Sequence, residues 1–242
     1  MSAQDAVAAV EDALVAVLFN VDQRQKLHNG DDLGLSSQLA ADLRTPSRCD
    51  VDALADEICT RLTQRANRGV GRLQNAFPKT IAACTQASGE APLFEAFLAS
   101  PESAPWMPVP FAGLGPCLEQ CFADWATQQP WADDDVVLHE LLTAVCRALA
   151  TDPTPAFVPP TAFRGQPGHW VAVTIGASPT VFAAVQGKVV TGPITPLIAG
   201  LLQGQSDADL AVAFGVPEPR VAMTRQAVVQ KGLLQSTEPT DR

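Results

Sequence analysis

Four prolines within ten residues divide this chain more sharply than any other feature of its sequence. The segment 151–160 reads TDPTPAFVPP, and a residue before proline is driven out of the α region, so no helix continues through it. Before this segment apolar residues recur at spacings of three and four, and after it short β-branched runs appear. The sequence therefore predicts a first domain at 1–150, a Pro-rich linker at 151–160, a second domain at 161–236 and a flexible tail at 237–242.

The protein is predicted to be mainly α, and its first domain an all-α helical bundle. Ala, Leu and Val supply most apolar residues and Tyr is absent, which favours packed helices over an aromatic-rich sheet. One amphipathic helix is predicted from residue 50 or 52 to about residue 69. Further helices are expected at 4–18, 37–43, 73–83, 92–99, 116–128 and 134–149.

A row of arginines lies along the distal part of that amphipathic helix, if the helix persists past Gly69. The four residues, spaced by four, three and four, are Arg61, Arg65, Arg68 and Arg72. Such a ridge is a candidate contact for a partner or an anion, because guanidinium forks match carboxylates. The alternative is a solvated face whose arginines pair with nearby carboxylates, and most charge stripes are of this kind.

The second domain is predicted to be a winged-helix-like module, in which a three-stranded antiparallel sheet is followed by three helices. The breaks between its strands are short enough for hairpins. Ser206 is expected to cap the second helix and Gly215 to end it. The expected strands are 169–175, 180–186 and 188–191, and the expected helices 193–203, 206–214 and 217–232, with a last strand from Leu233.

Motifs for hydrolytic, redox or metal chemistry are missing from the sequence. It contains no GxSxG, no HExxH and no phosphate-binding glycine loop. The six cysteines include no CxxC, and with only three histidines no ligand spacing matches a metal site, so neither metal nor cofactor is expected in this chain. A thiol- or metal-dependent enzyme would have to use Cys117, Cys121 and Cys146, which are better explained as buried helix residues.

The charge of the chain is negative and unevenly divided. Residues 1–160 hold 10 Lys and Arg against 21 Asp and Glu, whereas residues 161–242 hold 6 against 5, for a net charge of −10. This balance argues against nucleic acid as the main partner, because such binding neutralises many phosphates. No run approaches the length of a membrane span, and Asp5, Glu11 and Asp12 stand where a signal peptide needs positive charge. A cytoplasmic protein is expected.

Two stretches of the chain are similar to proteins of peptide-modifying pathways. Three strands followed by LLQGQSDADLAVAFGVPEPRVAMTRQAVVQKGLL resemble the peptide-recognition element of ribosomally made, modified peptides, whose small prototype is the pyrroloquinoline-quinone peptide chaperone. The patterns LVAVLFNVDQRQKL and RANRGVGRLQNAFPKTIAA resemble the helical domain in partner subunits of methanobactin-type multinuclear iron oxygenases. The resemblance implies that iron and catalysis belong to a partner enzyme in a heterodimer, and that this chain presents the precursor peptide to it.

The resemblance also implies where the peptide binds. A leader peptide is expected to add a strand to the exposed sheet edge and to lie in a groove between the third strand and the third helix. Cationic members of the groove would suit an acidic leader, while Val189, Met223 and Ala227 could instead be core residues. The implied peptide-binding residues are Lys188, Val189, Val190, Thr191, Arg220, Met223, Thr224, Ala227 and Lys231.

The leading function is therefore a noncatalytic subunit that binds a leader peptide for an iron-dependent oxygenase. A winged-helix transcription regulator is the alternative, because a capped helix, a glycine turn and a second helix also build DNA-binding modules. The thiol- or metal-dependent enzyme is a further alternative.

Overall fold

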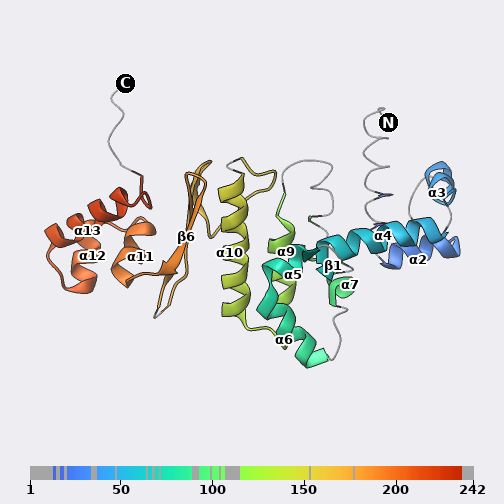
Figure 1. Cartoon of the computed structure of the whole chain (residues 1–242), viewed down its shortest axis with the longest axis horizontal. Helices are drawn as coiled ribbons and strands as arrows, with labels where there is room; N and C mark the ends of the chain where they lie inside the picture. The colour runs from blue at the N-terminus through green and yellow to red at the C-terminus, as the bar shows by residue number, and fades with distance from the viewer. Residues whose placement is uncertain are drawn as a thin grey trace, which may run out of the picture. The chain divides into compact units, whose positions relative to one another are not determined.

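The structure is a computed structural model of the chain, shown in Figure 1. Within the residues that it describes, the protein is mainly helical, with eleven helices and a four-stranded antiparallel sheet that precedes the last three of them. Most of the helix expected at 4–18, and the tail at 237–242, lie outside these residues. The described residues are 13–14, 17–18, 21–33, 37–46, 48–63, 65–66, 69–70, 72–88, 93–98, 100–103, 105–106, 115–152, 154–176 and 178–235.

The chain divides into two compact units. The N-terminal unit comprises residues 1–141 with 156–158, and the C-terminal unit comprises 142–155 with 159–242. The long helix α10 (Asp134–Thr151) contributes its first part to one unit and its second part to the other. No helix in the described part of the chain is long and apolar enough to span a membrane.

The N-terminal unit packs its helices around a cluster of aromatic side chains. The cluster forms where the ring of Phe122 meets Phe77 at a centroid distance of 4.8 Å, Phe97 at 5.3 Å and Trp125 at 5.6 Å. Phe77, Phe97 and Phe122 are almost completely buried, so this contact dominates the core. The other helices of the unit are α2 (Val21–Asn29), α3 (Ser37–Leu43), α4 (Arg48–Thr63), α5 (Arg72–Ala76), α6 (Pro78–Ser88), α7 (Leu93–Leu98) and α9 (Leu118–Ala126).

The helix expected to run to residue 69 is shorter than predicted. α4 ends at Thr63, and β1 (Arg65–Ala66) then pairs antiparallel with β2 (Gly69–Val70). Glycines at 69 and 71 disfavour continued helix, because glycine loses more backbone entropy there than other residues. The four arginines would align only on one continuous helix, and the structure contradicts that condition.

A buried carboxylate on α10 caps α6. Glu140 accepts hydrogen bonds from the backbone N–H of Lys79 at 2.8 Å and of Thr80 at 3.1 Å, and from the Thr80 hydroxyl at 2.8 Å. α6 begins at Pro78, where the missing N–H costs nothing in a first turn. The two free N–H groups that follow are therefore satisfied from another helix.

The sheet of the C-terminal unit has one strand more than predicted. Its strands lie in the order β3 (Arg164–Gln166), β4 (His169–Val173), β5 (Thr180–Val185) and β6 (Lys188–Pro193), all antiparallel. The strand predicted from Leu233 is wrong. Gly232 has a φ of 73°, and the chain turns there so that Leu233 packs into the core.

Three helices follow the sheet, with the predicted caps confirmed. They are α11 (Pro196–Leu202), α12 (Asp207–Phe214) and α13 (Glu218–Gln230). The Ser206 hydroxyl accepts a hydrogen bond from the N–H of Asp209 at 3.1 Å, and Gly215 ends α12 with a left-handed φ of 63°.

The two central strands of this sheet, β4 and β5, are buried on both faces. One face places Val171, Val181 and Ala183 against the helices, where Leu202 and Val228 belong to the same core cluster. The opposite face carries other buried residues, namely Ala172, Phe182 and Ala184. The second half of α10 belongs to the same unit and runs beside the sheet in Figure 1.

Candidate functional site

The outer strand of the C-terminal sheet is the candidate site. In the described part of the chain β6 pairs only with β5, so one of its edges is open. The two strands are joined by a two-residue turn at 186–187 in which both residues have positive φ, and this turn makes Val185 and Lys188 a hydrogen-bonded pair. The N–H of Ile194 donates to the carbonyl of Pro179 at 2.8 Å, which continues the same alternation of bonded pairs that begins at Lys188.

The alternation of hydrogen-bonded and non-hydrogen-bonded pairs decides which backbone groups of β6 are free. In an antiparallel pair, alternate residues bond to the neighbouring strand and the residues between them point away. The residues Lys188, Val190 and Gly192 therefore bond to β5. Val189 and Thr191 direct their N–H and C=O groups outward, and they are the groups that an added strand would use.

Side chains on β6 alternate between the two faces of the sheet. Val190 pairs with Ala183, which faces the helices, so Val190 and Lys188 lie on the helix-facing side. Val189 pairs with Ala184 and lies on the opposite face. The expectation that Val189 faces α13 is wrong for its side chain, because one residue along a strand reverses the face.

One flank of α13 carries the predicted groove residues. They include Arg220, Thr224, Ala227 and Lys231, whose spacing of four, three and four aligns them on the helix. α13 packs on the sheet through the buried Val228, in the same cluster as residues of β5, the strand beside β6. The predicted residues of strand and helix thus belong to neighbouring parts of one unit.

Apolar side chains are unusually exposed along these two elements. Val189 is 40% exposed, Val190 41% and Met223 71%. None of the three is a core residue, which answers the alternative raised for Val189 and Met223. Ala227 is exposed as well. Exposed apolar groups on an open edge strand and on a helix of the same unit are features that a docked peptide would cover.

The opposite flank of α13 is occupied by an ion pair. Arg225 donates to the carboxylate of Asp207 at 2.7 Å and to the carbonyl of Gln205 at 2.9 Å. This arginine therefore fastens α13 to the start of α12. The predicted cations Arg220 and Lys231, on the other flank of α13 and at its C-terminal cap, are exposed.

The cysteines that a thiol enzyme would need are not activated. Burial raises the pKa of Cys117 to about 12, with repulsion from Glu119 adding to it. Burial also raises the pKa of Cys121 to about 12 and that of Cys146 to about 11. No group of three or more His, Cys, Asp or Glu side chains within the described residues is placed to hold a metal ion.

These pKa values predict the order of thiol alkylation. At pH 8, about one Cys117 in ten thousand is ionised if its pKa is near 12. The exposed Cys49 should therefore react with iodoacetamide while Cys117, Cys121 and Cys146 stay unlabelled until denaturant is added. Peptide mapping by mass spectrometry measures this, and native labelling of Cys117 as fast as that of Cys49 would contradict it.

Of the four ridge arginines, the structure describes only the side chain of Arg72. Its guanidinium makes two hydrogen bonds to the carboxylate of Glu119, at 2.5 and 2.7 Å. Arg72 is therefore paired with a carboxylate, as the alternative of a solvated face predicted. The side chains of Arg61, Arg65 and Arg68 lie outside the described residues.

Two histidines have structural partners. The imidazole Nε2 of His169 lies 2.9 Å from the carbonyl oxygen of Gly232, which ties the start of β4 to the end of α13. His28 Nε2 lies 2.9 Å from a carboxylate oxygen of Asp52. The second pair was not predicted, because the two residues lie on different helices 24 positions apart.

Comparison of the chain with protein-family models, with curated proteins and with solved structures gives no match in any of the three.

Proposed function

We propose that this chain is a noncatalytic subunit that binds the leader of a ribosomally synthesised precursor peptide by strand addition along β6. It would present the peptide to a partner iron-dependent oxygenase. The observation that carries the proposal is the open edge of β6, where Val189 and Thr191 direct backbone donors and acceptors outward. Backbone hydrogen bonds along such an edge provide affinity, and neighbouring side chains provide specificity.

The flank of α13 supports this proposal and suggests the chemistry of the ligand. Arg220 and Lys231 are exposed there, and Lys188 lies on the helix-facing side of β6. Within the described residues these cations have no ion-pair partner, in contrast to Arg225. A leader with acidic residues between apolar ones would complement them.

A winged-helix transcription regulator is the second candidate, favoured by the succession of α12, a glycine turn and α13. The side chain of Arg225 is engaged by Asp207, which leaves α13 fewer cations for phosphate contacts. Acidic residues at the starts of α12 and α13, Asp207, Asp209 and Glu218, would repel a DNA backbone.

Titration separates the two candidates. Fluorescent peptides covering the short open reading frames beside the gene would be titrated with the full chain, and so would its own upstream DNA. The proposal expects saturable binding of one peptide and only salt-sensitive, sequence-independent binding of DNA. Selective binding of the upstream DNA, with no binding of any neighbouring peptide, would replace the proposal with the regulator.

Charge reversal on the flank should weaken peptide binding moderately. Arg220→Glu and Lys231→Glu are each expected to cost about 1 kcal/mol, or roughly fivefold in Kd, because exposed charge contacts are screened by water. The remaining binding should depend less on salt. Lys26→Glu on α2 is the matched control, since it makes the same charge change at an exposed residue of the N-terminal unit. Equal effects of all three substitutions would show that only net charge matters.

A further inference from the structure

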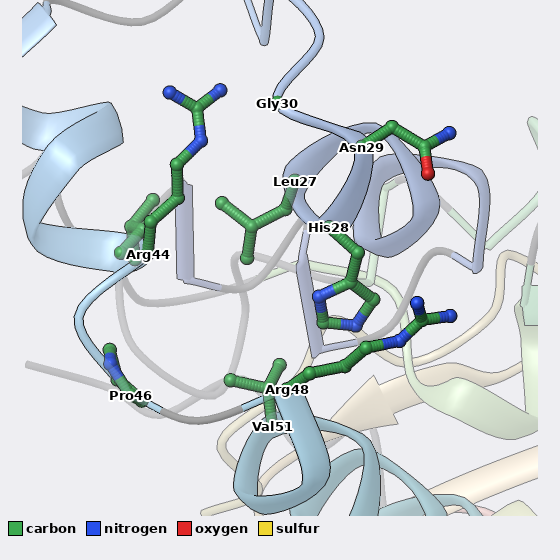
Figure 2. Close-up of a pocket in the computed structure, with 9 residues that line it drawn as sticks. Leu27, His28, Asn29, Gly30, Arg44, Pro46, Arg48 and Val51 are labelled. Carbon is green, nitrogen blue, oxygen red and sulfur yellow. The ribbon is translucent and has the colours of Figure 1, made fainter.

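A basic pocket lies in the N-terminal unit, among α2, α3 and α4 (Figure 2). Its volume is about 290 Å³, near the lower end for pockets that hold small molecules. The last residues of α2, the end of α3 and the first turn of α4 line it. Two arginines and a histidine are among the nine lining residues, and no carboxylate is. This is unexpected in a chain of net charge −10.

The lining of the pocket carries positive charge, and the carboxylate of Asp52 lies beside it. The carboxylate of Asp52 binds His28 and lies 3.6 Å from the guanidinium of Arg24 and 3.7 Å from that of Arg48. The hydrogen bond with His28 lowers the pKa of Asp52, and the two arginines lower it further, so this carboxylate is ionised at neutral pH. One negative charge is thus shared by two guanidinium groups.

A further guanidinium stands at the other side of the pocket. Arg44 donates to the backbone carbonyl of Asp31 at 2.9 Å, a bond that orients the side chain without neutralising it. In Figure 2, Leu27 and Val51 lie between Arg44 on one side and His28 with Arg48 on the other. The centre of the pocket is therefore apolar, and the cations flank it.

The combination of arginines and apolar side chains determines which class of ligand fits the pocket. An anion is attracted by the arginines, whose planar forks match a carboxylate with two parallel hydrogen bonds. Inorganic phosphate would satisfy the cations but leave the exposed Pro46 and the half-buried Val51 uncovered. An organic acid with a compact apolar body satisfies both parts of the pocket.

We propose that this pocket binds a small organic carboxylate, with the carboxylate at Arg48 and the apolar body over Pro46 and Val51. The same group exists as a free acid and as the C-terminal residue of a peptide. The site shares no residue with β6 or α13, so it stands or falls independently of the proposed function.

The test uses the full chain, labelled with ¹⁵N, and three probes followed by amide chemical shifts. N-acetyl-L-leucine should bind saturably with a Kd on the order of 1 mM, as expected for a ligand of this size. It should shift the amides of residues 27–30 and 48–51. N-acetyl-L-leucinamide, which lacks only the charge, and inorganic phosphate should each bind at least tenfold more weakly.

Variants locate the carboxylate. Arg48→Gln should weaken N-acetyl-L-leucine at least fivefold, and Arg48→Lys should weaken it less, because charge is kept while the fork is lost. Arg147→Gln, an exposed arginine outside the pocket, should leave binding unchanged. Both arginines are exposed, so the fold is expected to tolerate these changes, and the amide spectrum of each free variant checks this.

Three results would overturn the proposal: no saturable binding of N-acetyl-L-leucine, equal binding of its amide or of phosphate, or unchanged binding by folded Arg48→Gln. A short peptide ending in leucine identifies the source. Tighter binding than N-acetyl-L-leucine supports a chain terminus as the ligand, and equal or weaker binding supports a free acid.

Discussion

Replacing Glu140 with alanine is expected to destabilise the N-terminal unit by about 3 to 5 kcal/mol. Glu140 is 6% exposed, and its carboxylate accepts three hydrogen bonds, two of them from the first free N–H groups of α6. Alanine leaves all three donors without a partner. The two on the buried Thr80 cost roughly 1 to 3 kcal/mol each before relaxation, and the N–H of the exposed Lys79 costs less. The melting temperature of this unit should fall by about 10 °C.

Two further variants show that the hydrogen bonds, and not the charge alone, carry this effect. Glu140→Gln keeps the shape but turns one acceptor into a donor that meets another donor, so about half of the loss is expected. Asp135→Ala removes a charge from the exposed start of the same helix and should cost less than about 1 kcal/mol. Thermal unfolding is followed by tryptophan fluorescence, since Trp106, Trp125 and Trp131 lie in this unit. A stable Glu140→Ala protein would contradict the assignment.

Local signals in the sequence were enough to predict much of the C-terminal unit. Runs of β-branched residues predict β4 to β6, and the single glycine at 187 predicts the hairpin turn at 186–187. Ser206 and Gly215 are local signals as well, because each caps one end of the adjacent helix α12. β3 was missed since its sequence, Arg-Gly-Gln, holds no β-branched or aromatic residue. Its glycine is needed for space: a Cβ on Gly165 would lie 2.0 Å from the carbonyl oxygen of His169.

The N-terminal unit was harder to predict, because the contacts that define it join distant residues. Glu140 and Thr80 are 60 positions apart, and nothing in either local sequence marks the pair. Helical spacing continued across the end of α4, so periodicity alone placed Arg61 to Arg72 on one helix. The glycines near residue 70 were the available signal, and their cost in a helix outweighed the pattern.

In the candidate site, too, local features were predictable and contacts between distant residues were not. The sequence and its resemblance predicted the edge strand and one flank of α13 as the candidate site, and all of these residues except Thr224 are exposed. The sequence did not predict which backbone groups of β6 are free. The turn determines which residue pairs between β5 and β6 are hydrogen-bonded, and this pairing leaves the groups of the residues between them free. The pocket beside His28 and Asp52 was also missed, because three helices have to meet to form it.

Val189→Pro is expected to weaken peptide binding at least tenfold while the protein stays folded. The N–H of Val189 points away from β5, so proline removes a free edge donor and spares the bonds within the sheet. The proline ring also occupies space that an added strand would need. Proline is tolerated on edge strands in this orientation, so the loss of stability should stay within about 1 kcal/mol.

Val190→Pro is the matched control, because the two changes are one residue apart and differ in hydrogen-bond phase. The N–H of Val190 bonds to β5, and its loss interrupts the internal ladder, so this variant should unfold the C-terminal unit or lower its stability by about 3 kcal/mol. Val189→Thr keeps the N–H and changes only the side chain, and it should bind almost normally. Circular dichroism and titration of the same labelled peptide measure both properties. If folded Val189→Pro binds like the parent protein, the peptide does not pair with this edge; if Val189→Thr fails equally, the side chain and not the backbone makes the contact.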